Sequence, residues 1–205
     1  MIAPAPYLYK KLRMFDRIMR NFAMHISLND EEAAYLQSVL VHKTVKRNSP
    51  LLKSGEICRS IYFVNKGCLR IFNSDDNGDD HIILFFPENW WAVDISSFAD
   101  QEPAYYAIDA LEDTSVLYID YDTLEKLYTD IPKLERFFRI LTQNGFNIYQ
   151  RRITANLSKT AEERYDQFQQ QYPGLEQRIA QKHIAAYLGI TPVFLSKIRK
   201  RKFGM

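Results

Sequence analysis

Apolar residues recur every three or four positions near both ends of the chain, whereas the middle contains short β-rich runs. Residues 7–24 have helical spacing, and Asn29 with Glu32 forms a capping-box pattern for a second helix. Between about residues 45 and 120, turn residues such as Asn77-Gly78 separate the runs. Six short strands without intervening helices predict a barrel or roll. The strand candidates are 61–64, 68–72, 81–86, 90–93, 105–111 and 115–119.

A helix of about 25 residues is predicted to begin near Pro132. Its apolar positions advance by alternating steps of three and four residues, which is the spacing of a coiled coil. Leu124, Leu127 and Phe137 supply a different apolar face. Because two apolar faces need two partners, we expect one face to pack on the roll and the other to pair with a second copy; burial wholly within one chain is the alternative. The predicted dimer interface contains Phe138, Leu141, Gly145, Ile148 and Arg152.

The C-terminal segment has the pattern of a helix-turn-helix. Ala185 is a small residue where two helices can touch, and Gly189 can adopt the positive φ of a tight turn. Thr191 is then an N-cap, and Pro192 takes the first helical position. The second helix, about residues 192–202, is the predicted recognition helix. The expected shared core is Ile184, Leu188, Ile190, Leu195 and Ile198.

The net charge of +2 conceals an asymmetry. Residues 177–205 contain seven Lys and Arg and no Asp or Glu, which leaves 20 of the 27 basic residues against all 25 acidic residues elsewhere. A basic end on an acidic body indicates a polyanion partner, and it disfavours a purely structural helical hairpin. We expect Val193, Ser196 and Lys197 to face bases. The candidates for phosphate contacts are Lys182, Thr191, Arg199, Lys200, Arg201 and Lys202.

Composition and motif spacing disfavour several other classes. No apolar run approaches the roughly 20 residues of a membrane-spanning helix, and the N-terminus lacks a secretion signal, so we expect a cytoplasmic protein. Cys58 and Cys68 lack CxxC spacing and the four histidines lack ligand spacing, so no metal or cofactor is predicted. An enzyme on a cupin-like roll would need a metal-binding His/Glu set or a nucleophile beside a base, and neither is found.

Two motifs in the roll carry a family resemblance. Leu52-Lys53-Ser54-Gly55-Glu56 opens the roll, and Ile61-Tyr62-Phe63-Val64-Asn65-Lys66-Gly67 continues it. With the long helix and the helix-turn-helix, the chain resembles the Crp/Fnr family of bacterial transcription regulators over nearly its whole length. The resemblance implies an α+β protein: an N-terminal cyclic-nucleotide-binding-type jelly roll (double-stranded β-helix) as sensor, a dimerisation helix, and an all-α DNA-binding domain that recruits or blocks RNA polymerase. These parts correspond to residues 1–125, 126–157 and 158–205.

The resemblance is weakest where members that bind cyclic AMP hold the cyclic phosphate. Those members use a Gly-Glu loop and a downstream Arg-Ser pair, whereas this chain has Val93-Asp94 and Ala104-Tyr105. A buried phosphate without a cation and beside a carboxylate is unfavourable, so we do not expect cyclic AMP binding. The effector is unknown; a hydrophobic molecule, or none, is expected. The predicted effector pocket is Phe86, Trp91, Val93, Asp94, Ala104 and Tyr105.

Other branches of the family also differ from this sequence. The iron–sulfur branch needs an N-terminal cysteine cluster, and the haem branch needs an axial ligand, for which His81 is only a generic candidate. The two-stranded wing of the family is not expected, since the sequence stops three residues after Lys202. We predict a homodimer that binds a near-palindromic DNA site through recognition helices about 34 Å apart. The alternative is a ligand-sensing or protein-interaction module whose C-terminal hairpin docks a partner protein.

Overall fold

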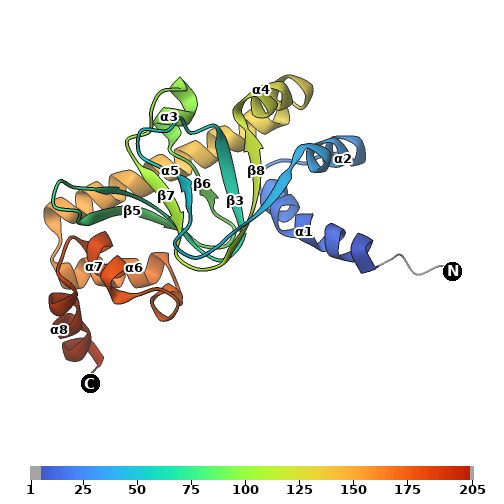
Figure 1. The fold of residues 1–205 in the computed structure, drawn as a ribbon. Coiled ribbons are helices and arrows are strands. Elements are labelled where there is room, and N and C mark those ends of the chain that lie inside the picture. The colour runs from blue at the N-terminus through green and yellow to red at the C-terminus, as the bar shows by residue number, and fades with distance from the viewer. Residues whose placement is uncertain (1–5, 204–205) are drawn as a thin grey trace.

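The computed structural model describes residues 6–203 (Figure 1). Two helices come first, and eight strands then follow within the described residues, with one short helix between the sixth and seventh strands. The bounds are α1 (Pro6–Ala23), α2 (Asp30–Val39), β1 (Val41–Val45), β2 (Pro50–Leu52), β3 (Ser60–Lys66), β4 (Leu69–Ser74), β5 (Asp80–Phe86), β6 (Trp91–Ala92), α3 (Ile95–Asp100), β7 (Ala107–Ala110) and β8 (Thr114–Asp120).

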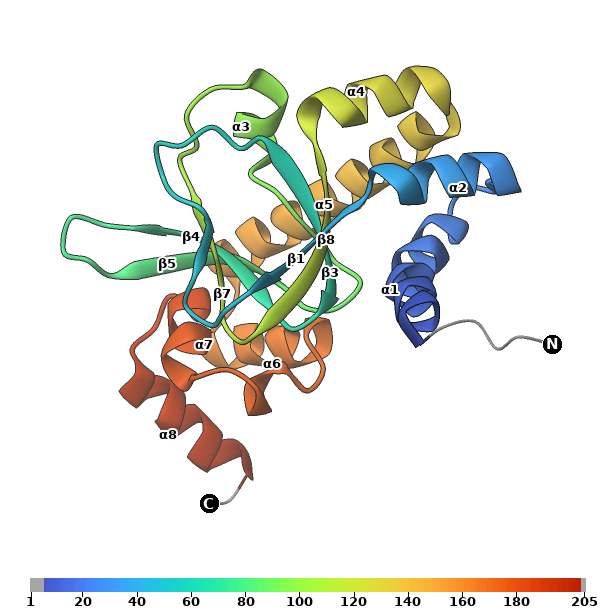
Figure 2. The ribbon, with the colours of Figure 1, turned by 45° about the vertical axis from the view of Figure 1, so that its right-hand side comes forward.

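The strands of the described region form two four-stranded antiparallel sheets (Figure 2). One sheet has the order β1-β8-β3-β6 and the other β2-β7-β4-β5. Their shared interior is fully apolar where Phe63 and Val116 of the first sheet meet Ile71 and Ile108 of the second, and each of these side chains is almost completely buried. The predicted β-roll within an α+β chain is therefore confirmed.

Helix α3 contradicts the expectation that no helix interrupts the strands. Its N-cap is Asp94, whose Oδ1 accepts a hydrogen bond from the Ser97 N–H at 3.3 Å. The side chain of an aspartate can cap a helix in this way, but six residues of helix carry too weak a periodicity to be recognised. The short strands β1 and β2 were missed for the same reason.

A local capping pattern identified α2. In the predicted capping box, Asn29 Oδ1 accepts the Glu32 N–H and Glu32 Oε2 accepts the Asn29 N–H, both at 2.8 Å. The helix of about 25 residues predicted to begin near Pro132 is present as α5 (Lys133–Ser158), and a separate helix, α4 (Tyr121–Asp130), precedes it. Leu124 and Leu127 therefore lie on α4, and the proposed boundary at residue 126 falls inside that helix.

The C-terminal region contains the predicted helix-turn-helix. It consists of α6 (Ala161–Gln171), a 3-10 turn η1 (Leu175–Gln177), α7 (Gln181–Leu188) and α8 (Pro192–Phe203). Gly189 ends α7 with φ 66°, and Thr191 Oγ1 accepts the Phe194 N–H at 3.2 Å. In residues 6–203, no helix has the length and apolarity needed to cross a membrane. Ile184, Leu188, Leu195 and Ile198 of the expected helix-turn-helix core are buried, as is Ala185 at the helix contact, whereas Ile190 is only half-buried against the same core.

Strand β5 joins the roll to this C-terminal region because both of its faces are buried. Leu84 and Phe86 belong to the core of the roll. Ile82 and Phe85 belong to a second core, which they share with α6, α7 and α8. The ring of Phe85 lies within 6.0 Å of the rings of Phe168, Tyr172 and Tyr187, measured between centroids. The C-terminal helices are therefore docked directly on the outer face of the sheet.

Candidate functional site

Helix α8 lies on the outside of the molecule, on the opposite side from α1 (Figure 1). Its inward side chains, Leu195 and Ile198, fill the helix-turn-helix core. This leaves Val193, Ser196 and Lys197 exposed, and Val193 is 68% accessible. The sequence prediction placed these three residues on the free face of the helix, and the structure leaves them free to meet a partner.

The cations near α8 fall into two groups. Lys182, Lys197 and Lys200 are exposed and form no ion pair with the described residues. By contrast, Arg201 pairs with Glu162 at 2.9 Å. Lys202 pairs with Asp166 of α6 and donates to Gln169 Oε1 at 3.1 Å. The surface pairs at Arg201 and Lys202 are weak, so these side chains can exchange a carboxylate for a phosphate at small cost.

Two further predicted DNA contacts have local roles. The hydroxyl of Thr191 caps α8, as described above, and remains exposed at the start of the helix. Arg199 is half-buried on the side of α8 that faces the protein. Arg178, which contributes to the basic charge of the segment, faces the roll instead: its two Nη atoms donate to the Glu88 carboxylate at 2.9 Å, and it also pairs with Glu112. These carboxylates raise the pKa of the Arg178 guanidinium.

A buried charge cluster lies between the roll and α7. Arg70 of β4 donates from Nε and Nη2 to the two carboxylate oxygens of Asp109, at 2.7 and 2.9 Å. Its Nη1 donates to Asp80 Oδ2 at 2.7 Å and lies 3.3 Å from His183 Nδ1. Burial and the neighbouring Arg70 charge lower the pKa of His183 to about 4. The imidazole is therefore neutral at pH 7, and α7 docks beside a cation that two carboxylates compensate.

Arg152 of α5 connects three parts of the molecule. It donates from Nη1 to the Ile83 carbonyl at 2.6 Å, and from Nη2 to the carbonyls of Ile82 and Tyr187 at 2.6 and 2.7 Å. The guanidinium also lies 3.7 Å from the centroid of the Tyr187 ring. Ile83 is the extra residue of a β-bulge, since Ile71 pairs with Leu84 and Phe72 pairs with Ile82. Arg152 thus satisfies carbonyls at the edge of β5 that the irregular pairing leaves available.

Several residues of the predicted dimer interface also have contacts within the chain. Phe138 is 7% exposed, and its ring packs within 5.3 Å of the rings of Trp91 and Phe137 in the same chain. Arg152 is engaged within the chain as described, and Leu141 and Ile148 pack partly against the core of the roll. The regularly spaced seam therefore faces inward over most of its length. Regular spacing identifies an apolar face, but it does not determine which surface covers that face.

An apolar cavity of about 360 Å³ lies between this seam and the roll. Phe86, Trp91 and Val93, three of the residues predicted for the effector pocket, line it. None of the lining side chains among the described residues is charged. Burial raises the pKa of Tyr149, one of them, to about 12. The lining residues that sequence reasoning did not assign to a pocket come mainly from the helices: Ile95, Phe98, Leu124, Tyr128, Phe138, Leu141, Thr142, Asn144, Gly145, Phe146, Ile148 and Tyr149.

The chain is similar to known proteins both in sequence and in fold. Residues 42–130 match the cyclic nucleotide-binding domain family. The chain is 28% identical over 191 residues to the fumarate and nitrate reduction regulatory protein of Vibrio cholerae, which covers 85% of this chain and 74% of that protein. The solved structure of FixK2 from Bradyrhizobium japonicum superposes with a TM-score of 0.70 at 19% identity, covering 80% of this chain and 84% of that one.

A solved transcriptional regulator of the Crp/Fnr family from Eubacterium rectale has a TM-score of 0.68 at 17% identity, and the match covers 85% of this chain and 83% of that one. The chain is therefore similar to transcription regulators of the Crp/Fnr family in sequence and in fold over most of its length. These relatives are regulatory proteins, which agrees with the prediction that the chain is not an enzyme.

Three of the predicted effector residues lie outside the apolar cavity. Asp94 is buried because it caps α3 and accepts the Tyr106 N–H at 3.3 Å. Ala104 is buried where its N–H donates to the Glu56 carbonyl at 2.8 Å. Tyr105 is exposed and packs edge-on against Tyr106. The structure therefore places these three residues apart from the cavity that Trp91 lines, because α3 turns the chain between Asp94 and Ala104.

Both cysteines of the chain are buried. Burial raises the pKa of the Cys58 thiol above its ordinary value, which keeps the less reactive protonated form. The backbone N–H of Cys58 donates a hydrogen bond to Ser97 Oγ at 2.9 Å, which connects the segment before β3 to α3. Among the described residues, no group of three or more His, Cys, Asp or Glu is arranged to hold a metal ion.

Proposed function

We propose that this protein regulates transcription as a homodimer that reads a near-palindromic DNA site with α8. The observation that supports this most directly is the exposed N-terminal half of α8, with Val193, Ser196 and Lys197. Lys182 and Lys200 are also exposed and form no ion pair with the described residues. Lys197 is suited to donate to guanine, Ser196 to either base type, and Val193 to contact a thymine methyl. Phosphates meet the surrounding lysines and arginines.

The test is selection of fragments of the source genome by the purified protein, followed by affinity measurements at two salt concentrations. We expect a near-palindromic consensus and an affinity that falls steeply with salt. Lys197→Ala is expected to cost about 1–3 kcal/mol at the selected site and to relax the preference for one base pair. Lys43→Ala, which removes an exposed lysine of β1, serves as the matched control. Salt-insensitive or undetectable binding would favour a protein partner for the C-terminal hairpin.

The dimer interface is better placed on a second face of α5. Phe146, Ile153 and Leu157 are separated by seven and four residues, so they share one side of the helix. Their exposed fractions are 61, 60 and 84%. Large apolar side chains that recur along one helix face usually mark a protein interface, and pairing with a second copy would bury all three.

Sedimentation equilibrium of Ile153→Glu tests this face. We expect the variant to shift from dimer to monomer, because the charge would be desolvated between two helices. Met24→Glu is the control, since Met24 is an equally exposed apolar residue at the end of α1. A dimer that persists in Ile153→Glu would contradict this placement of the interface.

The apolar cavity supports an uncharged, hydrophobic effector in place of cyclic AMP. A cyclic phosphate would be buried without a cation, since no basic side chain among the described residues lines the cavity. Calorimetric titration with cyclic AMP is expected to show no binding in the micromolar range. Saturable micromolar binding would contradict this part of the proposal and leave the DNA-binding part untouched. Recruitment of RNA polymerase is expected from the family.

A further inference from the structure

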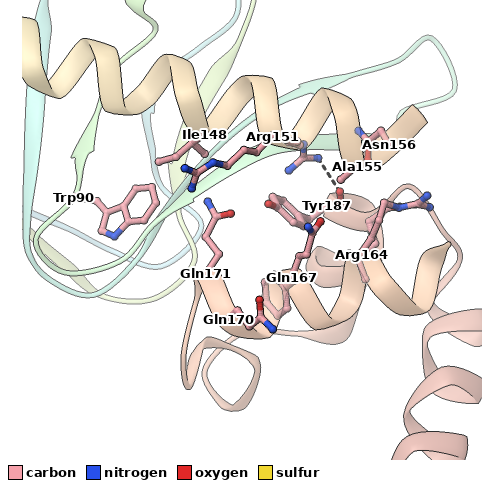
Figure 3. A pocket seen from close by; sticks show the side chains of 13 residues that line it. Trp90, Ile148, Arg151, Ala155, Asn156, Arg164, Gln167, Gln170, Gln171 and Tyr187 are labelled. Atoms are coloured by element: carbon pink, nitrogen blue, oxygen red, sulfur yellow. Dashed lines mark hydrogen bonds between the residues drawn. The ribbon is translucent and has the colours of Figure 1, made fainter. Parts of the chain in front are cut away.

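A second cavity, of about 350 Å³, lies where α5 crosses the C-terminal helices (Figure 3). Trp90 stands at one end of it, and Tyr187 lies beside the other residues contributed by α6 and α7. The cavity therefore touches the roll, the long helix and the helix-turn-helix at once. Its volume is at the lower end of the range for small-molecule sites, which is about 300–1,000 Å³.

Three guanidinium groups surround this cavity, contributed by Arg151, Arg152 and Arg164. No Asp or Glu among the described residues lines it. Arg152 donates only to main-chain carbonyls, and Arg164 donates to the carbonyls of Lys159 and Leu188 at 2.9 and 3.1 Å. Their hydrogen bonds are largely satisfied, but their positive charges have no carboxylate partner within the described chain.

Two features show unused binding capacity. The Nε atom of Arg164 is buried without a hydrogen-bond partner among the described residues, which is costly unless a ligand or water satisfies it. Arg151 is exposed and forms no hydrogen bond or ion pair with the described residues, and its side chain reaches over the cavity toward Gln171 (Figure 3). The contrast with Arg70 and Arg178 is informative, because each of those arginines has two carboxylate partners.

We propose that this cavity is a binding site for a small organic anion, a phosphate or carboxylate attached to a planar ring. The anionic group lies against Arg151 and the neighbouring guanidinium groups, which form charge-assisted and often bidentate hydrogen bonds with such groups. The ring packs toward Trp90, and the amide side chains of the wall provide polar contacts to its substituents. The lining amides are Asn156, Gln167, Gln170 and Gln171.

The site goes beyond the proposed function, and only its regulatory consequence rests on that function. A ligand held between Arg151 of α5 and Gln171 of α6 would favour the docked position of the helix-turn-helix over any other position. By linkage, the anion and DNA would then affect each other's binding equally. Anion binding itself is independent of whether the protein binds DNA.

The experiment is a calorimetric titration of the full chain, in the absence of DNA, with phenyl phosphate, benzoate and phenol in turn. We expect saturable binding of at least one of the two anions, and binding of phenol that is at least tenfold weaker. Comparison of phenyl phosphate with benzoate identifies which anionic group the site prefers. Arg151→Gln is expected to weaken the preferred anion about tenfold to a hundredfold, the range for loss of a charge-assisted hydrogen bond.

Arg136→Gln is the matched control, because Arg136 is an exposed arginine of the same helix that does not line the cavity. This variant is expected to bind the anion as the unaltered chain does. Three results would overturn the proposal: no saturable binding of either anion, equal affinity for phenol, or equal losses in Arg151→Gln and Arg136→Gln. Because DNA is absent from the titration, failure of DNA recognition would not alter any of these outcomes.

Discussion

Two cavities of nearly equal size lie along α5, and their chemistry is opposite. The one between the roll and the helix measures about 360 Å³ and has no charged lining among the described residues. The one between the helix and the C-terminal helices measures about 350 Å³ and is surrounded by three arginines. Trp90 and Ile148 line both. Size therefore says little about what a cavity binds, and the flanking side chains decide it.

The difference follows from what each half of α5 must cover. The first half packs on the interior of the roll, where only apolar side chains are tolerated without partners. The second half passes the edge strand β5, whose bulge leaves carbonyls for Arg152 to satisfy. A helix can be apolar against a sheet interior but needs donors against a sheet edge.

The largest expected effect tests the apolar side. Phe138→Ala should reduce the free energy of unfolding by about 3–5 kcal/mol, because it leaves a void in a packed aromatic cluster. Urea unfolding at two protein concentrations is the measurement, and the loss should not depend on concentration. Phe146→Ala, at an exposed position of the same helix, should instead show a smaller and concentration-dependent loss. A concentration-dependent loss in Phe138→Ala, with a concentration-independent loss in Phe146→Ala, would place Phe138 in the dimer interface.

On the charged side, two adjacent arginines should behave differently. Arg152→Gln should lower the free energy of unfolding by about 2–4 kcal/mol, since three carbonyls lose a charged donor. Arg151→Gln should change it by less than about 0.5 kcal/mol, because its side chain forms no contact of this kind with the described residues. Chemical denaturation of both variants is the check, and equal losses would contradict the assigned roles.

The contact between α7 and the roll should weaken in acid. His183 has a pKa of about 4 in the folded chain, against an ordinary value near 6.5. Between about pH 4 and pH 6.5, the imidazole of residue 183 is protonated in the unfolded chain and neutral in the folded chain. This contribution to stability is therefore complete above about pH 6.5 and is lost as the pH falls toward 4. Burial, Arg70 and Lys182 lower the pKa, whereas Asp109 and Asp80 oppose them.

Urea midpoints measured from pH 7 to pH 4 test this dependence. His183→Gln should flatten the profile over that range, because glutamine does not titrate. His42→Gln, at an exposed histidine of β1, should leave the slope unchanged. A slope that survives in His183→Gln would assign the acid sensitivity to other groups.

A modest gain of stability is expected on the apolar side. A Cβ at Gly145 would meet no heavy atom within 4 Å, and the residue lies inside α5. Gly145→Ala should therefore raise the free energy of unfolding by about 0.5–1 kcal/mol, through the better helix propensity of alanine. Thermal unfolding is the measurement. Gly78→Ala should be destabilising instead, since Gly78 has a φ of 82° in a hairpin turn.

Elements that depend on local chemistry were predicted closely. The capping box at Asn29 and Glu32, the turn at Gly189 and the cap at Thr191 each involve atoms within a few residues of one another. Their geometry can therefore be inferred from neighbouring side chains alone. The exposed face of α8 was inferred in the same way, because the positions of a two-helix motif that do not form its core must face away from it.

The candidate pockets depended on contacts that no short segment contains. Phe86, Trp91 and Val93 line the apolar cavity, but its opposite wall comes from α5, more than 40 residues away in sequence. Asp94 and Tyr105 lie outside this cavity because the short helix α3 redirects the chain between them. The cavity with three arginines was not foreseen, since its arginines lie on two helices whose crossing is set by packing.

The sequence by itself determined the order of parts, the roll, the helix-turn-helix and the basic surface of α8. These follow from periodicity, turn residues and charge, all of which act over short distances along the chain. Only the tertiary structure decided which face of α5 is buried and why strand β5 is apolar on both sides. Burial of an apolar helix face is favourable against any apolar surface, so the sequence pattern of that face does not identify the surface that covers it.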